Sequence, residues 1–256
     1  MTVEHDAADR QPHLEPAQAT VTLMIDFEEP LRVDGQALPG AWVGGPSKTP
    51  DAVELGSKQT SLDLKLTPLG AYRVFGVPPR ELAGAVVSLE ELLGAAGGDF
   101  VDRLRDATTW WRRFELVDRF LCERAAAGPS PTPAVDHAWS RLCATTGRVQ
   151  IDTLARELQM SRRHLTAVFH EQVGLPPKAV ARLLRFAAVR RRLEEKPTQL
   201  AEVAYECGYF DQSHLSRDFR DFAGATPGDF LANQVSKTHE VGNKRPFVQD
   251  GFVGAT

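Results

Sequence analysis

The sequence lacks most of the features by which enzymes and membrane proteins are recognised. No histidine lies between His13 and His137 in this chain of 256 residues, which removes histidine-based catalytic sites and histidine metal ligands from that interval. Glycine-rich phosphate-binding motifs are absent, and no run approaches the roughly 18 apolar residues of a membrane span. A carboxylate-only site that uses Glu54 or Asp63 stays open, although exposed strand charges are the simpler interpretation. We therefore expect neither an enzyme nor a membrane protein.

Cysteine is scarce, and its spacing matches neither a zinc site nor a redox pair. The chain has 3 cysteines, Cys122, Cys143 and Cys207, and we expect each to be a reduced thiol in or just below the core. This usage is typical of a cytoplasmic protein. Residues 1–18 are acidic and have no apolar stretch of the kind that forms a signal peptide. We expect residues 1–18 to be flexible.

Positive charge is not in excess over the whole chain, whose formal net charge is −4. Residues 136–235 hold 14 Lys and Arg and 12 Asp and Glu, which gives +2 for that region and −6 for the remainder. Contacts with nucleic-acid phosphates depend on local rather than total charge. The charge balance is therefore compatible with nucleic-acid binding by the C-terminal region.

What the chain does contain is a helix–turn–helix pattern at residues 200–222. The first helix is expected to end at Gly208, because glycine enters the left-handed conformation at little steric cost. Asp211 is placed to cap a second helix. That helix has an apolar stripe opposite a polar face, formed by Leu215, Phe219 and Phe222 against Ser213, Arg217 and Arg220.

A short amphipathic helix with hydroxyl and guanidinium groups on one face suits the major groove of DNA, where arginine bonds guanine through two hydrogen bonds. The alternative interpretation is a packed helix pair with a solvated polar face. For this stretch alone the two interpretations carry about equal weight, since such pairs also occur in proteins that bind no DNA.

The pattern occurs twice, which favours the first interpretation. Residues 154–177 repeat it, with Leu165 and Phe169 lying 50 positions before Leu215 and Phe219. Upstream of the turn the offset falls to 49, so the second turn has one extra residue. Residues 176–196, between the copies, form a predicted helix with proline in its first turn and a buried stripe of Val180, Leu183, Leu184 and Ala187. Such a helix would hold two recognition helices about 34 Å apart, in successive major grooves.

Residues 136–235 resemble the DNA-binding domain of the arabinose-regulator (AraC/XylS) family of bacterial transcription regulators. The resemblance rests on LARELQMSRRHLTAVFHEQVGLPP, on the linker arginines Arg182 and Arg185, and on AEVAYECGYFDQSHLSRDFRDFAGATPGDF. It implies a seven-helix, all-α domain with two helix-turn-helix units joined by a linker helix.

The resemblance also implies which side chains face DNA. The base-contacting set is Arg162, Arg163, Thr166, Ala167, Gln212, Ser213, His214, Ser216 and Arg217. Helical geometry agrees for Arg163, Ala167, Ser213 and Arg217, and puts Arg162 and Gln212 nearer the flank. The family often has a polar or basic residue where Ala167 stands, so this position is suited to a thymine methyl. Phosphate contacts are expected from Lys178, Arg182, Arg185 and Arg220.

The N-terminal half reads as an α+β domain at residues 19–127, with short strands followed by helices. Strands are predicted at 20–27, 41–44 and 61–66, and helices at 68–75, 89–93, 100–106 and 109–126. This half is similar to the sensor halves of some regulators of the family, which are often cupin-like β-barrels, but we expect fewer strands here. Residues 128–135 form a proline-rich linker, and 236–256 a polar tail.

Two side-chain sets in this half are candidates for binding. Trp42, Tyr72 and Arg73 could line an effector pocket, although a core position for Trp42 and a surface position for Arg73 are the simpler interpretations. Trp111, Phe114, Val117 and Leu121 are expected to face the domain core from one helix, or a dimer partner if the stripe is too wide to be covered.

These observations predict a cytoplasmic, sequence-specific DNA-binding transcription regulator without a cofactor. The expected partners are double-stranded DNA at two adjacent major grooves, a small-molecule effector in the N-terminal domain, a second copy in a homodimer, and RNA polymerase if the protein activates transcription. One alternative is a DNA-targeted, repair-like enzyme, for which Cys122 is the available thiol nucleophile. Another is a DNA-binding protein that has no effector.

Overall fold

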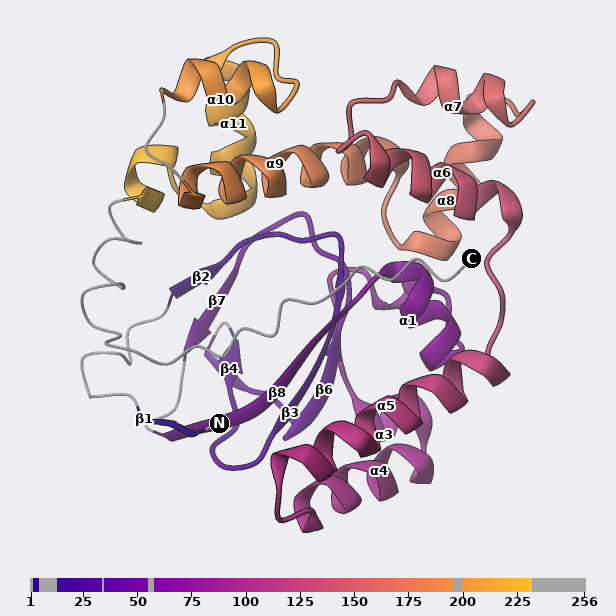
Figure 1. The fold of residues 1–256 in the computed structure, drawn as a ribbon, viewed down its shortest axis with the longest axis vertical. Coiled ribbons are helices and arrows are strands. Elements are labelled where there is room, and N and C mark those ends of the chain that lie inside the picture. Colours follow the sequence, from indigo (N-terminus) through magenta and orange to yellow (C-terminus); the bar gives the residue numbers. More distant parts are fainter. Residues whose placement is uncertain (1, 5–12, 34, 55–57, 196–198, 232–256) are drawn as a thin grey trace.

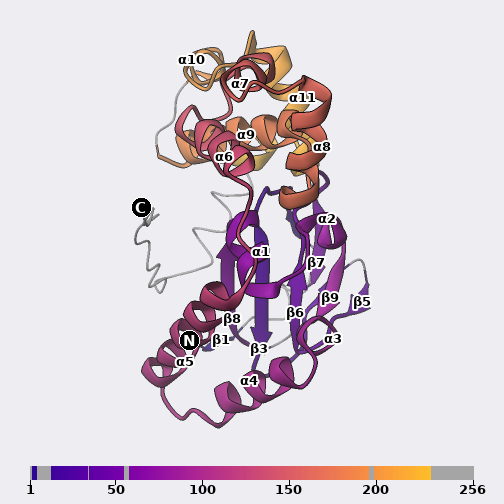
Figure 2. The same cartoon turned by 90° about the vertical axis from the view of Figure 1, so that its right-hand side faces the viewer.

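The fold places a strand-rich N-terminal half beneath a helical C-terminal half. In the computed structural model, residues 2–4, 13–33, 35–54, 58–195 and 199–231 are described. The strands and the helices α1 to α5 form the lower part of the molecule in Figures 1 and 2, and the helices α6 to α11 form the upper part.

The larger sheet has the strand order β1-β8-β3-β6-β9, and its neighbouring strands are antiparallel. Val21, Leu23 and Ile25 alternate along β3 and have no exposed surface, as the period-2 pattern predicts. They pack with the helices α1, α3, α4 and α5 in one apolar core. The strands of this sheet are β1 (Thr2–Glu4), β3 (Val21–Asp26), β6 (Ala41–Gly44), β8 (Lys58–Leu66) and β9 (Val86–Ser88).

The smaller sheet has the order β2-β7-β4-β5 and is also antiparallel. Its strands are β2 (His13–Glu15), β4 (Arg32–Val33), β5 (Gln36–Ala37) and β7 (Asp51–Glu54). The two sheets contain more strands than the three that were predicted, because several strands are too short for their alternation to be recognised. The expectation that residues 1–18 are flexible is wrong for 2–4 and 13–18, since these contain β1, β2 and the buried Ala17; residues 5–12 lie outside the described chain.

The helices of this half begin and end where local chemistry predicts. Thr67 caps α1 by accepting from the amide of Gly70, and Gly76 ends it with φ of 76°. Ser88 and Glu91 form the predicted capping box. The helices are α1 (Pro68–Phe75), α2 (Pro79–Leu82), α3 (Leu89–Leu93), α4 (Ala95–Asp106) and α5 (Trp110–Ala127).

Helix α5 buries only part of the stripe that was predicted to face the core, because Val117 and Leu121 pack there but Trp111 and Phe114 do not. Trp111 and Phe114 are 75% and 47% exposed, so their assignment to the domain core is wrong. The buried residues are Leu116 and Val117. Trp110 packs edge-on against Phe27, with 5.7 Å between ring centroids. Trp110, rather than Trp111, therefore packs against the residue that follows the central strand β3.

The helical half contains the predicted repeat. Ser161 accepts from the amide of His164 at 3.1 Å, and Asp211 accepts from the amide of His214 at 2.7 Å, so both second helices begin at a side-chain cap. The helices are α6 (Pro133–Ala144), α7 (Ile151–Glu157), α8 (Arg162–Val173), α9 (Pro177–Glu195), α10 (Leu200–Glu206) and α11 (Gln212–Ala223). A last helical turn spans 227–231, and the predicted tail lies outside the described residues.

The two helix pairs share one apolar core with α9. Phe186 on α9 contacts Phe219 and Phe222 on α11, with ring centroids 5.1 and 5.4 Å apart. The predicted stripe of α9 is correct for Val180 and Leu183, but Ala187 is exposed. The straight run of α9 spans the upper part of the molecule in Figure 1. The two pairs are thereby attached to opposite ends of a single helix.

The N-terminal half contacts the C-terminal ends of both repeated helices. Arg80 on α2 forms an ion pair with Glu171 on α8 at 2.7 Å. The amide of Ala17 donates to the carbonyl of Phe222 on α11 at 2.8 Å. Gly174, which ends α8 with φ of 84°, lies so close to α2 that a Cβ atom there would stand 2.7 Å from the carbonyl oxygen of Pro79.

Gly174→Ala is expected to lower the free energy of unfolding by about 2–4 kcal/mol, because it combines left-handed strain with overpacking against α2. Gly76→Ala is the matched control. Gly76 has φ of 76° and nothing within 4 Å of an added Cβ, so only the strain of about 1–2 kcal/mol is expected. Chemical denaturation measures both. Equal losses would contradict a tight contact between the two halves at Gly174.

Candidate nucleic-acid interface

The helices α8 and α11 occupy equivalent places in the two helix-turn-helix units. Figure 2 shows both at the same side of the helical half. Their C-terminal ends, at Gly174 and Gly224, lie against the N-terminal half. An added Cβ at Gly174 would meet Pro79 and Pro46, and one at Gly224 would meet Leu14. The N-terminal ends, where the predicted base-contacting residues begin, are turned away from these contacts.

The predicted base-contacting side chains lie on the outer faces of these helices. Those classed as exposed are Arg162, Arg163, Ala167, Gln212, Ser213 and Arg217. Those half-buried are Thr166, His214 and Ser216. The opposite faces carry Leu165, Phe169, Leu215 and Phe219, which are at most 1% exposed. The polar face of each helix is therefore available to a ligand.

Two of these side chains already have partners within the protein. The guanidinium of Arg162 donates to the carboxylate of Asp152 on α7 at 3.4 Å, in an exposed pair. His214 packs edge-on against Tyr209, with 5.1 Å between ring centroids. The remaining exposed side chains of the set are Arg163 and Ala167 on α8, and Gln212, Ser213 and Arg217 on α11. Each helix therefore presents one arginine together with a small side chain.

Arg182, which was predicted to contact a phosphate, has carboxylate partners within the fold. Its guanidinium donates to Asp218 at 2.7 Å and to Asp221 at 2.7 Å, and lies 4.7 Å from the ring of Phe222. Asp218 is only 1% exposed. These hydrogen bonds raise the pKa of Arg182 and join α9 to α11. The buried carboxylate of Asp218 requires such a partner, and the phosphate contact of Arg182 stays a prediction.

Arg185 is held within the fold in a similar way. Its guanidinium donates to the carbonyl of Gly147 at 2.6 Å, in the turn before α7, and lies 5.6 Å from the ring of Tyr209. Burial raises the pKa of Tyr209. Arg185 thus contacts both helix-turn-helix units from α9. Of the four predicted phosphate ligands, Lys178 and Arg220 are exposed.

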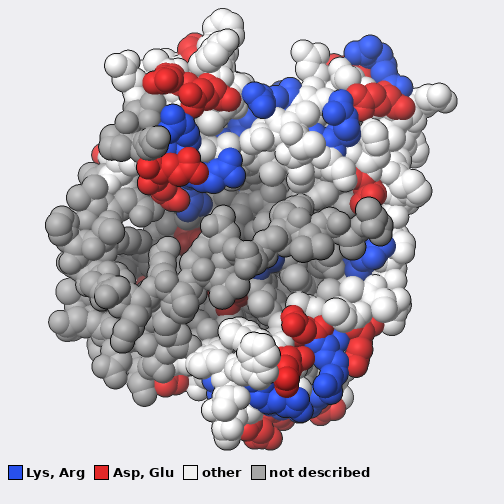
Figure 3. Space-filling model, viewed as in Figure 1, with Lys and Arg blue, Asp and Glu red and all other residues white. Residues whose placement is uncertain are grey.

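Charges of both signs are interspersed on the face drawn in Figure 3. Blue and red side chains occur together over the helical half and over α4 and α5, so no large patch of one sign covers this view.

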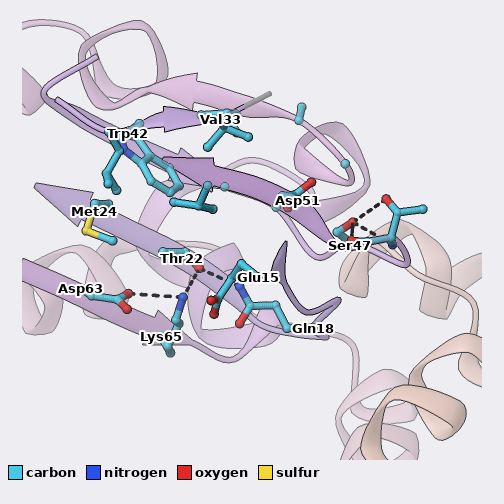
Figure 4. Close-up of a pocket in the computed structure, with 18 residues that line it drawn as sticks. Glu15, Gln18, Thr22, Met24, Val33, Trp42, Ser47, Asp51, Asp63 and Lys65 are labelled. Atoms are coloured by element: carbon cyan, nitrogen blue, oxygen red, sulfur yellow. Dashed lines mark hydrogen bonds and ion pairs between the residues drawn. The ribbon is translucent and has the colours of Figure 1, made fainter. Parts of the chain in front are cut away.

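A cavity of about 250 Å³ lies in the N-terminal half, between the two sheets. Figure 4 shows Thr22, Met24, Asp63 and Lys65 of the larger sheet facing Val33 of the smaller one. These residues alternate along β3 and β8 with the residues that pack under the helices. The polar positions of the period-2 pattern therefore line this cavity, although Asp63 and Lys65 are also exposed to solvent.

The cavity wall combines paired charges with an unpaired indole. Lys65 lies 3.3 Å from Asp63 and donates to the hydroxyl of Thr22 at 2.9 Å. Trp42 is 8% exposed, and among the described atoms its Nε1–H has no hydrogen-bond partner. This nitrogen atom is itself buried, so it offers no accessible donor to the cavity.

Sequence reasoning found this site only in part. Trp42 lines the cavity, whereas Tyr72 and Arg73 on α1 are not among its lining residues. Asp63 does line it, while Glu54 pairs with Arg32 at 3.7 Å. The sequence signal for this cavity was the set of residues that alternate with the apolar ones along β3 and β8. That these residues line a cavity could be inferred only with the second sheet in place, and its strands are too short to show a clear alternation in the sequence.

The cysteines and the described acidic residues give little support to an enzyme site. Cys122 is exposed on α5, which contradicts the expected core position, whereas Cys207 is buried and Cys143 half-buried. Burial raises the pKa of Cys143 to about 11. In the described ranges, no group of three or more His, Cys, Asp and Glu is arranged to hold a metal ion. No described helix is long and apolar enough to cross a membrane.

Comparison with known proteins identifies the helical half. A family described as a helix-turn-helix domain matches residues 154–233. An HTH-type transcriptional regulator of Mycobacterium tuberculosis is 33% identical over 84 residues, which are 33% of this chain and 32% of the relative. The regulator GlxA of Rhizobium meliloti is 27% identical over 157 residues, which are 60% of this chain and 46% of the relative. The match thus spans less than half the length of each relative.

The whole chain has a similar fold to ToxT of Vibrio cholerae, which was solved with (E)-4-(8-methylnaphthalen-1-yl)but-3-enoic acid. The TM-score is 0.51 at 11% identity, over 90% of this chain and 96% of the other. Together these matches define a class of structure, a strand-rich domain followed by a DNA-binding domain. Residues 154–233 of the helical half form a helix-turn-helix domain, as the family match describes.

Arg182→Ala is expected to lower the free energy of unfolding by about 2–3 kcal/mol, because it leaves the buried Asp218 without its cation. This is below the cost for a fully buried pair, since the Arg182 side chain is 33% exposed. Arg191→Ala is the control on the same helix. The Arg191 side chain is 74% exposed and 3.8 Å from Glu195, so its loss should cost under about 0.5 kcal/mol. Similar values in denaturation would refute the structural role of Arg182.

Proposed function

We propose that the protein is a sequence-specific DNA-binding transcription regulator in which α8 and α11 enter two adjacent major grooves. The observation that carries this proposal is the presence of two equivalent helices, each capped at its start and polar on its outer face, at opposite ends of α9. The 19 residues of α9 span about 28 Å at 1.5 Å per residue. That length is compatible with grooves about 34 Å apart on one side of the duplex.

Within this proposal, base contacts come from the exposed faces of α8 and α11. Arg163 and Arg217 have the donor geometry for guanine, and Ala167 suits a thymine methyl. Lys178 and Arg220 are the proposed phosphate ligands, and Arg182 and Arg185 position the two units. The proposed partners are double-stranded DNA, RNA polymerase if the protein activates transcription, and a second copy of this chain.

We also propose that a small molecule bound in the cavity between the sheets controls DNA affinity. The support is that the cavity and the helix contacts share the same segments. Gln18 and Ser47 line the cavity, and the amide of Ser47 donates to the carbonyl of Gln18 at 3.0 Å. The amide of Ala17 donates a hydrogen bond to Phe222 of α11. Pro46 lies beside Gly174, at the C-terminal end of α8. A ligand that moves either segment would therefore shift a recognition helix.

The two alternatives make different demands on the N-terminal half. A DNA-targeted enzyme would use an exposed nucleophile such as Cys122, which stands on α5 away from the cavity lining. A DNA-binding protein without an effector would need no ligand in the cavity between the sheets. We favour the effector-controlled regulator on the basis of the cavity and its shared segments.

Selection of bound sequences from a random duplex pool tests the DNA-binding proposal. We expect the full chain to enrich two short motifs about one helical turn apart. Arg217→Ala should weaken binding to the enriched site by about 1–3 kcal/mol and relax base preference at one position. Arg220→Ala should weaken all sequences alike and reduce the salt dependence. If Arg217→Ala weakens random and enriched DNA equally, α11 does not read bases through this residue.

The charge of the cavity lining predicts which ligands it prefers. Its described charged residues are Glu15, Asp51, Asp63 and Lys65, three acidic and one basic. At equal concentration, 2-(naphthalen-1-yl)ethylamine should therefore raise the melting temperature more than naphthalene-1-acetate does. Met24→Trp, which fills the cavity, should remove the shift, whereas Met24→Leu should retain it. A larger shift with the acetate would refute the predicted preference.

A further inference from the structure

The turns of the two helix-turn-helix units differ by one residue, and the structure identifies it. In the first unit the helix ends at Leu158, Gln159 takes a left-handed conformation with φ of 53°, and Met160 precedes the cap Ser161. In the second unit the corresponding residues are Cys207, Gly208 with φ of 77°, Tyr209, Phe210 and Asp211. Two residues thus stand where the first unit has one.

The backbone hydrogen bonds decide which of the two is extra. The amide of Met160 donates to the carbonyl of Ala155 at 2.9 Å, and the amide of Tyr209 donates to that of Ala204 at 2.9 Å. Ala155 and Ala204 are equivalent in the repeat. Tyr209, which is 5% exposed, therefore takes the place of Met160 in the core. The inserted residue is Phe210.

Phe210 has no evident part in the packing of the described chain. It immediately precedes the cap Asp211, the position from which an apolar side chain usually packs on the fourth helical residue, here Leu215. Phe210 is 93% exposed, so it makes no such contact, and Leu215 is buried at 1% by other groups. A turn residue with this exposure would ordinarily be polar. An aromatic ring at this point requires an explanation outside the fold.

The surroundings of Phe210 favour DNA as that explanation. Asp211, Gln212 and Ser213 follow it directly and are exposed and polar, whereas an apolar protein interface would need a wider patch. In the proposed function this end of α11 approaches the bases. Phenylalanine makes an apolar contact with the C5-methyl group of thymine, which projects into the major groove.

We propose that Phe210 is a specificity-determining residue of the second helix-turn-helix unit and reads a thymine methyl beside the bases contacted by Gln212 and Ser213. This inference rests on the proposed DNA-binding function. It assigns a role to the one position at which the second unit departs in length from the first. The two units would then differ in the bases they read as well as in their place on the duplex.

Parallel selections from a random duplex pool test the inference, with the full chain and the variants Phe210→Ala and Phe210→Leu. Phe210→Ala should lose the preference for thymine at one position beside the second motif and bind the wild-type site roughly tenfold more weakly. Phe210→Leu, which retains an apolar side chain, should keep part of the preference. Trp111→Ala is the matched control, because Trp111 is an aromatic residue that is 75% exposed on α5, in the other half of the chain.

Each result has a distinct meaning. Loss of thymine preference in Phe210→Ala but not in Trp111→Ala, with unchanged melting temperatures, supports the inference. Equal weakening of all sequences would place the ring on the sugar–phosphate backbone and overturn base reading. Unchanged DNA binding with impaired activation would assign Phe210 to a protein partner and overturn it as well. If the wild-type chain enriches no sequence, the proposed function fails, and the inference fails with it.

Discussion

The packing of both helix-turn-helix units onto α9 is the constraint on which the rest of the helical half depends. Phe186 lies against the rings of Phe219 and Phe222, and Arg182 and Arg185 bond to groups on either side of the same helix. Apolar burial supplies most of the stabilisation, while the charged contacts fix orientation because each needs a particular geometry. Two polar helix faces are thereby held at a set separation.

The contact between the two halves of the molecule extends this constraint to the cavity. The recognition helices rest on the N-terminal half through their C-terminal ends, where Gly174 permits close approach to the backbone of α2. The segments that make these contacts also line the space between the sheets. Because packed interfaces tend to shift between discrete arrangements, a ligand in the cavity has a short physical route to α8 and α11. In the proposed function, a movement of α8 or α11 would change how the exposed N-terminal end of that helix contacts DNA.

Several parts of the fold could be predicted because their causes are local. The caps at Asp211 and Ser88 depend on residues within one helical turn, and the glycine that ends α1 depends on its own φ. The position of Trp111 could not be predicted in the same way. Its neighbour Trp110 is equally apolar, and only the contact of Trp110 with Phe27, at the end of the central strand β3, shows which of the two is covered.

The sequence by itself determined the repeat, the capped helices, the polar faces of α8 and α11 and the extra residue in the second turn, because each follows from spacing along one segment. Tertiary structure alone decided the roles of charges that meet across segments. Arg182 was predicted only as a phosphate ligand, and its contact with the buried carboxylate of Asp218 is visible only in the structure. Likewise, the sequence did not show that Asp63 and Lys65, which are both exposed, line a space shared with a second sheet. The free energy of a charge depends on the groups around it in space, and residues distant in the chain can supply those groups.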